Sequence, residues 1–337
     1  MSELAALFPP CAGGGERLGL GGAPLGNLFA AVDEAQARAT VDAAWDGGCR
    51  SFDTAPHYGH GLSERRLGDA LRERPREAFV LSSKVGRLLR VKPGAARNQH
   101  GYVSSLPFDQ HWDYSAGGVR RSLEDSLQRL GLARIDVAYV HDCDAVTHGA
   151  QAGAVLRQVL DETLPTLQRM KAEGSIRAIG LGVNDVSIVL EVLRESELDA
   201  LLLAGRYSLL DHSALPTLLP LCRARGVHVA IGGVFNSGLL ATGTRHGTPM
   251  FDYASAPREW IERTARIEAL CAAHGVPLRA AALQFVLAQP AVEAVLLGAR
   301  APHEWQDAQA MLRVRIPPAF WQALRDAGLV PDAAPTP

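Results

Sequence analysis

The sequence predicts a (β/α)8 barrel, and three observations predict it. Eight short apolar segments alternate with longer amphipathic segments along 337 residues. Most of the apolar segments are nearly continuous runs of Val, Ile, Leu and Ala, which is typical of parallel strands buried on both faces. Several amphipathic segments end in glycine, as helices with left-handed caps do. We therefore expect one barrel domain over residues 1–337, with its core at about 17–315.

The expected elements follow one another in barrel order. The strands are expected at residues 17–22, 49–55, 79–85, 135–141, 176–183, 200–205, 227–233 and 292–298. The helices are expected at residues 33–48, 62–74, 115–131, 159–174, 185–196, 213–226, 257–275, 278–289 and 302–312. A doubly wound sheet is the alternative, but its G-x-G-x-x-G turn is missing. The glycine clusters at 13–15, 19–21 and 180–182 all lack the third glycine.

A long segment without helical period, residues 86–116, follows the third expected strand. Such connections are uncommon and are usually functional or disordered. In a barrel this one rises from the C-terminal end, where active sites lie. It offers a candidate substrate wall made of His100, Tyr102, Phe108, His111, Trp112 and Tyr114. We predict that His111, Trp112 and Tyr114 contact substrate; the alternative is a surface excursion that packs only on itself.

Composition and charge limit the classes of partner. The chain is 47% hydrophobic and 21% charged, which is ordinary for a globular protein with a sizeable core. A formal net charge of -2 leaves no basic surface for nucleic acid or an anionic membrane. The five cysteines are scattered and form no C-x-x-C pair, which favours a reducing compartment. Without a signal-peptide pattern or a run of about 18 apolar residues, we expect a cytoplasmic monomer or small homo-oligomer.

Polar side chains gather where neighbouring expected strands end. Asp53 ends the second strand, with Tyr58 in the following loop, while Lys84 ends the third and His141 the fourth. Parallel strands bring these ends to one rim of the barrel. A lysine there needs a counter-ion, which Asp53 can supply, and its charge is expected to lower the pKa of Tyr58. Such a phenol can exchange a proton with a substrate oxygen that His141 orients.

Each of these residues, taken singly, also has an ordinary structural explanation. An aspartate after a strand is commonly a cap, and a tyrosine in a glycine-rich loop commonly packs. The stretches HYGH (57–60) and HDCD (141–144) also suggest metal ligands. Neighbouring residues on a strand point to opposite faces, so no metal site is predicted. The four positions together favour catalysis.

The contexts FDTAPHYG, SSKVG and VHD resemble the catalytic tetrad of the aldo-keto reductase superfamily, and the resemblance covers about residues 17 to 315. The stretches LLLAGRYSLLD, GGVFNSGLLA and FDYASAP resemble its branch of L-fucose dehydrogenase, D-threo-aldose 1-dehydrogenase and pyridoxal 4-dehydrogenase. The resemblance implies an NAD(P)-dependent barrel enzyme with Asp53, Tyr58, Lys84 and His141 as catalytic residues. It implies oxidation of an aldose such as L-fucose at C1 to its lactone. The alternatives are oxidation of pyridoxal to 4-pyridoxolactone and a non-catalytic NAD(P)-binding barrel.

The resemblance also implies where the dinucleotide lies. Asn184 matches the family's asparagine that holds the nicotinamide carboxamide, whereas Ala204 and Ile231 replace a glutamine and a stacking aromatic residue. Further contacts are expected around the pyrophosphate, from Asn236, Ser237, Gly238, Gly298, Ala299 and Arg300.

Two acidic residues are expected to select the cofactor. Glu304 stands where NADP-preferring relatives have an arginine, and Asp307 follows one turn later. Two carboxylates would repel a 2′-phosphate but accept hydrogen bonds from a ribose 2′-hydroxyl. The expected cofactor is NAD, with NADP as the alternative because Arg300 is close by.

Overall fold

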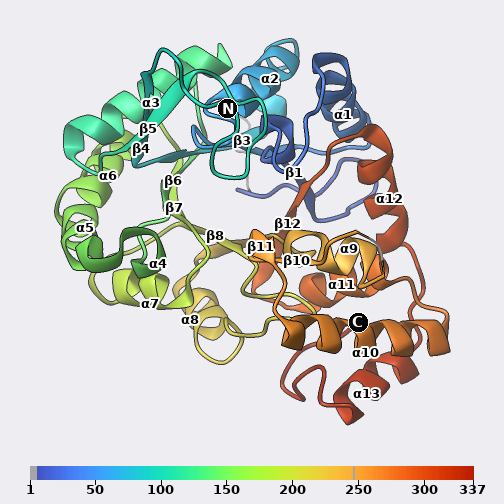
Figure 1. Ribbon diagram of the computed structural model, residues 1–337. Coiled ribbons are helices and arrows are strands. Elements are labelled where there is room, and N and C mark those ends of the chain that lie inside the picture. The colour runs from blue at the N-terminus through green and yellow to red at the C-terminus, as the bar shows by residue number, and fades with distance from the viewer. Residues whose placement is uncertain (1–5, 246) are drawn as a thin grey trace.

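The computed structural model describes residues 6–245 and 247–337 and contains a closed barrel of parallel strands (Figure 1). The barrel strands are β1 (Leu18–Gly21), β2 (Ser51–Asp53), β3 (Val80–Val85), β6 (Val137–His141), β7 (Ala178–Val183), β8 (Ala200–Ala204), β9 (His228–Gly232) and β12 (Val292–Gly298). Strand β1 closes the barrel, because Gly21 pairs with Asp53 on one side and with Gly298 on the other. The predicted (β/α)8 fold is confirmed.

The helices form a ring outside the strands (Figure 1). They are α1 (Glu34–Asp46), α2 (Leu62–Leu71), α3 (Ala116–Leu130), α4 (Ala145–His148), α5 (Ala152–Gln158), α6 (Leu164–Ala172), α7 (Val186–Glu195), α8 (Leu218–Arg225), α9 (Leu239–Thr242), α10 (Arg258–His274), α11 (Leu278–Ala288), α12 (Pro302–Leu312) and α13 (Pro318–Asp326). Local chemistry sets their ends: Asp33 and Ser115 accept N-cap hydrogen bonds, and Gly131 and Gly275 cap α3 and α10 in the left-handed conformation. Helix α13 lies beyond the predicted core and packs on α10.

Two antiparallel hairpins stand at the C-terminal end of the barrel, on opposite sides of its opening (Figure 1). The predicted long connection after β3 contains the first, β4 (Arg87–Val91) paired with β5 (Phe108–Trp112). The second consists of β10 (Met250–Phe251) and β11 (Ala254–Ser255). Neither hairpin was predicted, because β4 and β5 are half exposed and carry charged residues instead of a continuous apolar run.

The alternation of side chains along each strand separates two parts of the core. Side chains that point outward pack under the helices, while Val80, Tyr139 and Leu202 belong to a second cluster inside the barrel. At the C-terminal ends this inward series continues into Lys84 and His141. The barrel register therefore aims polar side chains at the space above the core.

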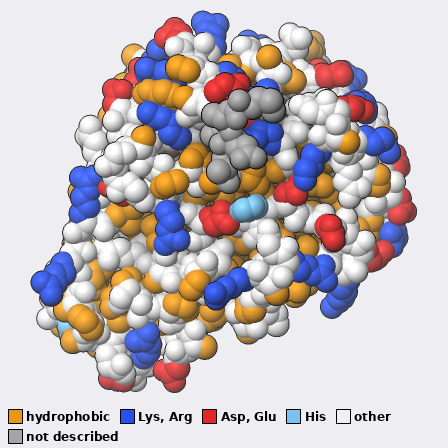
Figure 2. Space-filling view, turned by 180° about the vertical axis from the view of Figure 1, so that it is seen from behind, with side chains coloured by type: hydrophobic (Ala, Val, Ile, Leu, Met, Phe, Trp, Pro, Cys, Tyr) orange, Lys and Arg blue, Asp and Glu red, His pale blue; other side chains and the backbone are white. Residues whose placement is uncertain are grey.

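The molecular surface carries interspersed charges of both signs (Figure 2). Within residues 6–245 and 247–337, no single helix is long and apolar enough to cross a membrane. Among these residues, only α10 and α11 taken together have the length and apolar composition of a membrane span, and they are bent by 102° relative to each other. All five cysteines are buried and free.

Candidate active site

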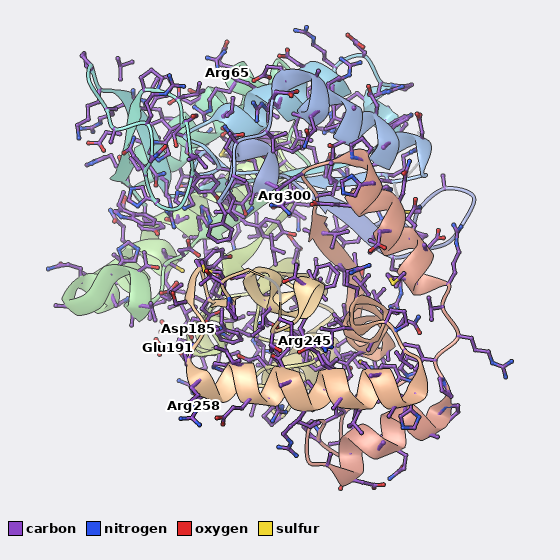
Figure 3. The ribbon with its side chains drawn as sticks, turned by 45° about the vertical axis from the view of Figure 1, so that its right-hand side comes forward. Arg65, Asp185, Glu191, Arg245, Arg258 and Arg300 are labelled. Atoms are coloured by element: carbon purple, nitrogen blue, oxygen red, sulfur yellow. The ribbon has the colours of Figure 1, made fainter. Side chains whose placement is uncertain are left out.

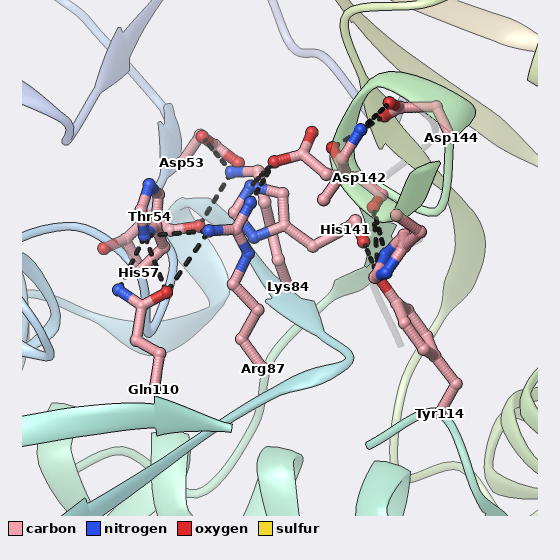
Figure 4. Close-up of polar contacts among 12 residues, drawn as sticks. Asp53, Thr54, His57, Lys84, Arg87, Gln110, Tyr114, His141, Asp142 and Asp144 are labelled. Carbon is pink, nitrogen blue, oxygen red and sulfur yellow. Dashed lines mark hydrogen bonds and ion pairs between the residues drawn. The ribbon is translucent and has the colours of Figure 1, made fainter. Parts of the chain in front are cut away.

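A buried ion pair joins the ends of β2 and β3. Lys84 Nζ lies 2.7 Å from Asp53 Oδ2 and donates a second hydrogen bond to the carbonyl of Thr54 at 2.9 Å (Figure 4). The Ser82 hydroxyl donates to the other Asp53 oxygen at 2.7 Å. Burial raises the pKa of the Asp53 carboxyl, and the neighbouring Lys84 ammonium opposes that rise. The structure thus places the cation of Lys84 beside its predicted counter-ion.

Tyr58 and His141 lie against this ion pair. The Lys84 ammonium lies 4.6 Å from the centre of the Tyr58 ring, over its face. The rings of Tyr58 and His141 are nearly perpendicular, with centroids 6.2 Å apart. The fold therefore brings all four predicted tetrad side chains together at one rim.

The pKa of Tyr58 differs from the expectation. Burial raises this pKa well above its usual value, and the negative charge of Asp53 raises it further. The expected lowering of this pKa by Lys84 is wrong, because desolvation outweighs an ammonium whose charge is shared with Asp53. Burial also lowers the pKa of His141 well below its usual value, so His141 is neutral at neutral pH.

Three adjoining cavities run across the barrel opening. The largest, about 510 Å³, lies between the loop after β1 and α12 and is lined by Pro24, Ser237, Gly238, Gly298, Arg300 and Glu304, among others. The middle cavity, about 180 Å³, shares Gly298 and Ser237 with the first and reaches Asp53 and Tyr58. The third, about 200 Å³, shares Tyr58 with the middle cavity and contains Lys84 and His141. A groove therefore leads from α12 to the tetrad.

The residues of this groove fit an extended dinucleotide. The side-chain oxygen Oδ1 of Asn236 is buried and has no partner within the described chain, so it offers a free acceptor to a ligand. Asn184 and Ala204 line both cavities at the tetrad. Gly298 keeps the groove open beside Pro24, because a Cβ at this position would lie 2.8 Å from the Pro24 side chain.

Two residues discussed as cofactor contacts point away from the groove. Ala299 is fully buried and lines none of the three cavities. Ile231 is also fully buried in the outer core, so it offers no face for stacking. Aromatic side chains that border the groove include Phe235 near α12, and Phe29 and Tyr253, whose ring centroids lie 6.3 Å apart.

The acidic residues on α12 are paired with arginines. Glu304 accepts hydrogen bonds from the Arg300 guanidinium at 2.9 Å and from its backbone N–H at 2.8 Å. Figure 3 shows Arg300 at the start of α12, turned toward the centre of the molecule. Asp307 accepts a hydrogen bond from Arg279 Nε at 2.7 Å. Both arginines are thus neutralised from within the chain.

The predicted substrate contacts on the hairpin lie outside the third cavity. His111 is exposed, and Trp112 stacks its ring on the guanidinium of Arg87 at 4.1 Å. Tyr114 is buried, and its hydroxyl donates to the His141 carbonyl at 2.7 Å. Contact of these three residues with substrate stays a prediction that none of the cavities supports.

The third cavity is lined by two residues of the expected wall, His100 and Tyr102, and by residues outside that wall. The lining residues include His57, His100, Tyr102, Asp142 and Tyr253, beside the tetrad members Tyr58, Lys84 and His141. His57 and Asp142 adjoin Tyr58 and His141 in sequence, in the HYGH and HDCD stretches, and that adjacency was the signal available. Within residues 6–245 and 247–337, no group of three or more His, Cys, Asp or Glu side chains could hold a metal ion.

Comparison with known proteins decides the family. Residues 17–328 match the model of the aldo/keto reductase family. The chain belongs to the aldo/keto reductase family. It is 45% identical over 326 residues to pyridoxal 4-dehydrogenase of Microbacterium luteolum, covering 93% of this chain and 94% of that protein. It is 39% identical over 320 residues to D-threo-aldose 1-dehydrogenase of a Pseudomonas species, with the same coverage.

Solved structures of this family share the barrel. An aldo-keto reductase from Bacillus halodurans in its holo form superposes with a TM-score of 0.70 at 25% identity, covering 92% of this chain and 91% of that chain. The glycerol dehydrogenase from Gluconobacter oxydans has the same TM-score at 23% identity, covering 94% and 93%. This aldo/keto reductase is an NAD(P)-dependent oxidoreductase. The two dehydrogenase relatives confirm the predicted branch of the family.

Proposed function

We propose that this aldo/keto reductase oxidises a cyclic hemiacetal to its lactone, with an aldose such as L-fucose, oxidised at C1, as the leading substrate. The observation that carries the proposal is the groove, which ends at a cavity containing Tyr58, Lys84 and His141. A nicotinamide dinucleotide bound there supplies the hydride acceptor. The cavity beyond Tyr58 is then the place for the substrate.

The tetrad residues act on protons and charge in this proposal. Tyr58 takes the proton of the anomeric hydroxyl as general base. Lys84, held by Asp53 at 2.7 Å, places positive charge beside the phenolate that forms. His141, kept neutral by burial, donates a hydrogen bond to the sugar oxygen. Asn184 lies between the two cavities, where it can hold the cofactor amide next to the substrate.

The cavity lining favours a sugar. His57, His100, Asp142 and Asn184 supply hydrogen-bonding groups around the tetrad, and a polyhydroxylated substrate needs such partners when it is buried. Trp112, Tyr114 and Phe235, which would suit a pyridine ring, lie outside this cavity. The 39% identity to a D-threo-aldose 1-dehydrogenase supports the same choice.

Pyridoxal is the second candidate substrate. The 45% identity to pyridoxal 4-dehydrogenase extends over 93% of the chain. Tyr102 and Tyr253 line the cavity and offer aromatic faces to a pyridine ring. The same proton transfer through Tyr58 would convert the pyridoxal hemiacetal to 4-pyridoxolactone.

NAD is the proposed cofactor. Glu304 already occupies the guanidinium and backbone N–H of Arg300, and Asp307 occupies Arg279. A 2′-phosphate would have to displace these carboxylates or lie beside them, whereas a 2′-hydroxyl would not.

The test follows reduced nicotinamide by absorbance, with NAD and NADP supplied separately against L-fucose, D-arabinose and pyridoxal. We expect NAD-dependent oxidation of the sugars and a loss of at least about 100-fold in kcat for Tyr58→Phe. Tyr207→Phe, a buried tyrosine stacked on Phe285 away from the groove, is the matched control. Turnover of pyridoxal alone would move the proposal to the second substrate, and full activity of Tyr58→Phe would refute it.

A further inference from the structure

His57 occupies a special place at the tetrad. It immediately precedes Tyr58, is half buried and lines the cavity that contains Lys84 and His141. Its ring centroid lies 5.8 Å from that of His141 and 5.1 Å from that of Tyr102. A side chain in this position reaches whatever binds beside Tyr58.

The hairpin fixes one nitrogen of the His57 ring as an acceptor. Arg87 Nη1 lies 3.0 Å from His57 Nδ1 (Figure 4). A guanidinium has only donors, so Nδ1 accepts and the ring proton must be on Nε2. Both amide atoms of Gln110 lie near Nδ1, Nε2 at 2.7 Å and Oε1 at 3.0 Å, and Oε1 also accepts from Arg87 Nη1 at 3.2 Å. An Nδ1 acceptor satisfies all three side chains, because it takes hydrogen bonds from Arg87 Nη1 and Gln110 Nε2 and leaves Gln110 Oε1 to Arg87.

His57 lines the cavity, but the two partners of its Nδ1, Arg87 and Gln110, do not. The part of the ring at the cavity is therefore the side away from Nδ1. We propose that His57 presents an Nε2–H donor, set by Arg87, to an oxygen of the substrate next to the reacting carbon. This inference rests on the proposed function of the cavity.

The same arginine also fixes an acceptor. The other terminal nitrogen of Arg87 pairs with the Asp142 carboxylate, which lines the cavity and lies 3.5 Å from His141 Nε2. Asp142 takes up a left-handed backbone conformation, with φ of 35°, that is costly for a residue with a side chain. Arg87 thus holds a donor, His57, and an acceptor, Asp142, at one cavity.

This pairing defines a class of substrate. The cavity matches a hemiacetal that carries an oxygen acceptor and a hydroxyl donor near the reacting carbon, and both proposed substrates do. A plain alkyl aldehyde would offer no partner to the Nε2–H of His57 or to the Asp142 oxygen that Arg87 does not hold, and sites built on hydrogen bonds reject such analogues strongly. Trp112 contributes indirectly, because its ring supports the Arg87 guanidinium.

The first test reads the tautomer directly. Long-range proton–nitrogen correlation spectra of the isotope-labelled, full-length protein distinguish Nε2–H from Nδ1–H imidazoles, and His57→Gln assigns the signal. We expect the Nε2–H form in the wild type and its loss in Arg87→Met. Arg90→Met, on the exposed part of β4, should leave the spectrum unchanged. An Nδ1–H form in the wild type would overturn the inference.

The second test measures steady-state kinetics with L-fucose and with pyridoxal. His57→Leu should lower kcat/KM roughly tenfold, by loss of one hydrogen bond, with NAD affinity unchanged. His57→Gln, which retains an N–H donor, should recover part of that loss. His228→Gln, beside Glu293 at the opposite end of the barrel, is the control. Unchanged kcat/KM in His57→Leu would refute the donor role.

The two tests separate the inference from the proposed function. If the wild type oxidises neither compound, the proposed function fails and the spectra still decide whether Arg87 sets the His57 tautomer. If the wild type is active and the tautomer is Nδ1–H, only the inference fails.

Discussion

At the scale of single residues, the position of Lys84 controls what Tyr58 can do. The ammonium lies over the face of the phenol ring and gives its hydrogen bonds to Asp53 and Thr54. Its charge is therefore already balanced before substrate arrives, and burial raises the pKa of Tyr58. The phenol is a neutral donor in the free enzyme and becomes a base only at high pH or when bound ligands change its surroundings.

The raised pKa of the Tyr58 phenol predicts how the rate of oxidation depends on pH. The reaction needs the phenolate of Tyr58, whose pKa burial raises, so kcat/KM should rise with pH without a plateau below about pH 10. The measurement is initial rate with NAD and substrate over a series of buffers of constant ionic strength. A plateau near neutral pH would show that the bound cofactor lowers this pKa, as the sequence alone had suggested.

The ion pair itself predicts a stability effect. Lys84→Met leaves the buried Asp53 carboxylate without its counter-ion and should cost about 3–5 kcal/mol in free energy of unfolding. Lys84→Met combined with Asp53→Asn removes both charges, so most of that loss should be recovered while activity stays absent. Urea unfolding of the two variants and the wild type gives the comparison. Equal stability of the single and double variants would contradict the argument.

At the scale of elements, the loop after β1 is held by one side chain of α2. Arg66 is buried and donates to the carbonyls of Leu25 and Val32, each at 2.7 Å, and it pairs with Glu34 at 2.7 Å. The loop supplies Pro24 to the cofactor groove. The position of one wall of the groove thus depends on a helix on the outside of the barrel.

Arg66→Ala should therefore lower both stability and cofactor affinity. Loss of hydrogen bonds from a buried cation should cost about 3 kcal/mol of unfolding free energy and weaken NAD binding at the loosened loop. Urea unfolding and a fluorescence titration with NAD measure the two effects. Arg65→Ala, at the exposed neighbouring position of α2, should change neither. NAD affinity equal to the wild type in Arg66→Ala would contradict the coupling.

Helix α12 carries the prediction about cofactor choice. Glu304→Gln removes the carboxylate that holds Arg300, which frees a cation for a 2′-phosphate. The ratio of kcat/KM for NADP over NAD should rise roughly tenfold. Glu259→Gln, in the first turn of α10, is a control with the same change of charge. A ratio unchanged by Glu304→Gln would place the 2′ position away from this pair.

At the scale of the whole molecule, buried neutral histidines couple folding to pH. Burial lowers the pKa of His212 to about 4, and its ring packs against Phe285 of α11. As pH falls, His212 of the unfolded chain takes up a proton at about pH 6.5, whereas His212 of the folded chain stays neutral until the pH approaches its lowered pKa. The stabilising contribution is therefore full above about pH 6.5 and is lost as pH falls from there toward the folded pKa.

The wild type should consequently lose more thermal stability between about pH 6.5 and about pH 4 than His212→Gln does. Calorimetry at a series of pH values measures Tm for both proteins. Parallel Tm curves would show that His212 is not neutral in the folded state.

The sequence by itself determined the barrel and the order of the tetrad. Continuous apolar runs report burial on both faces, a local property, and Asp53, Tyr58, Lys84 and His141 follow directly from the strand ends. Only the tertiary structure decided the rest. The contacts of Arg87 with His57 and Asp142 join segments 30 and 55 residues apart. The pairing of β4 with β5 involves half-exposed, charged segments that no apolar run marks in the sequence. The direction of the Tyr58 pKa shift depends on desolvation by surrounding atoms, which no local pattern encodes.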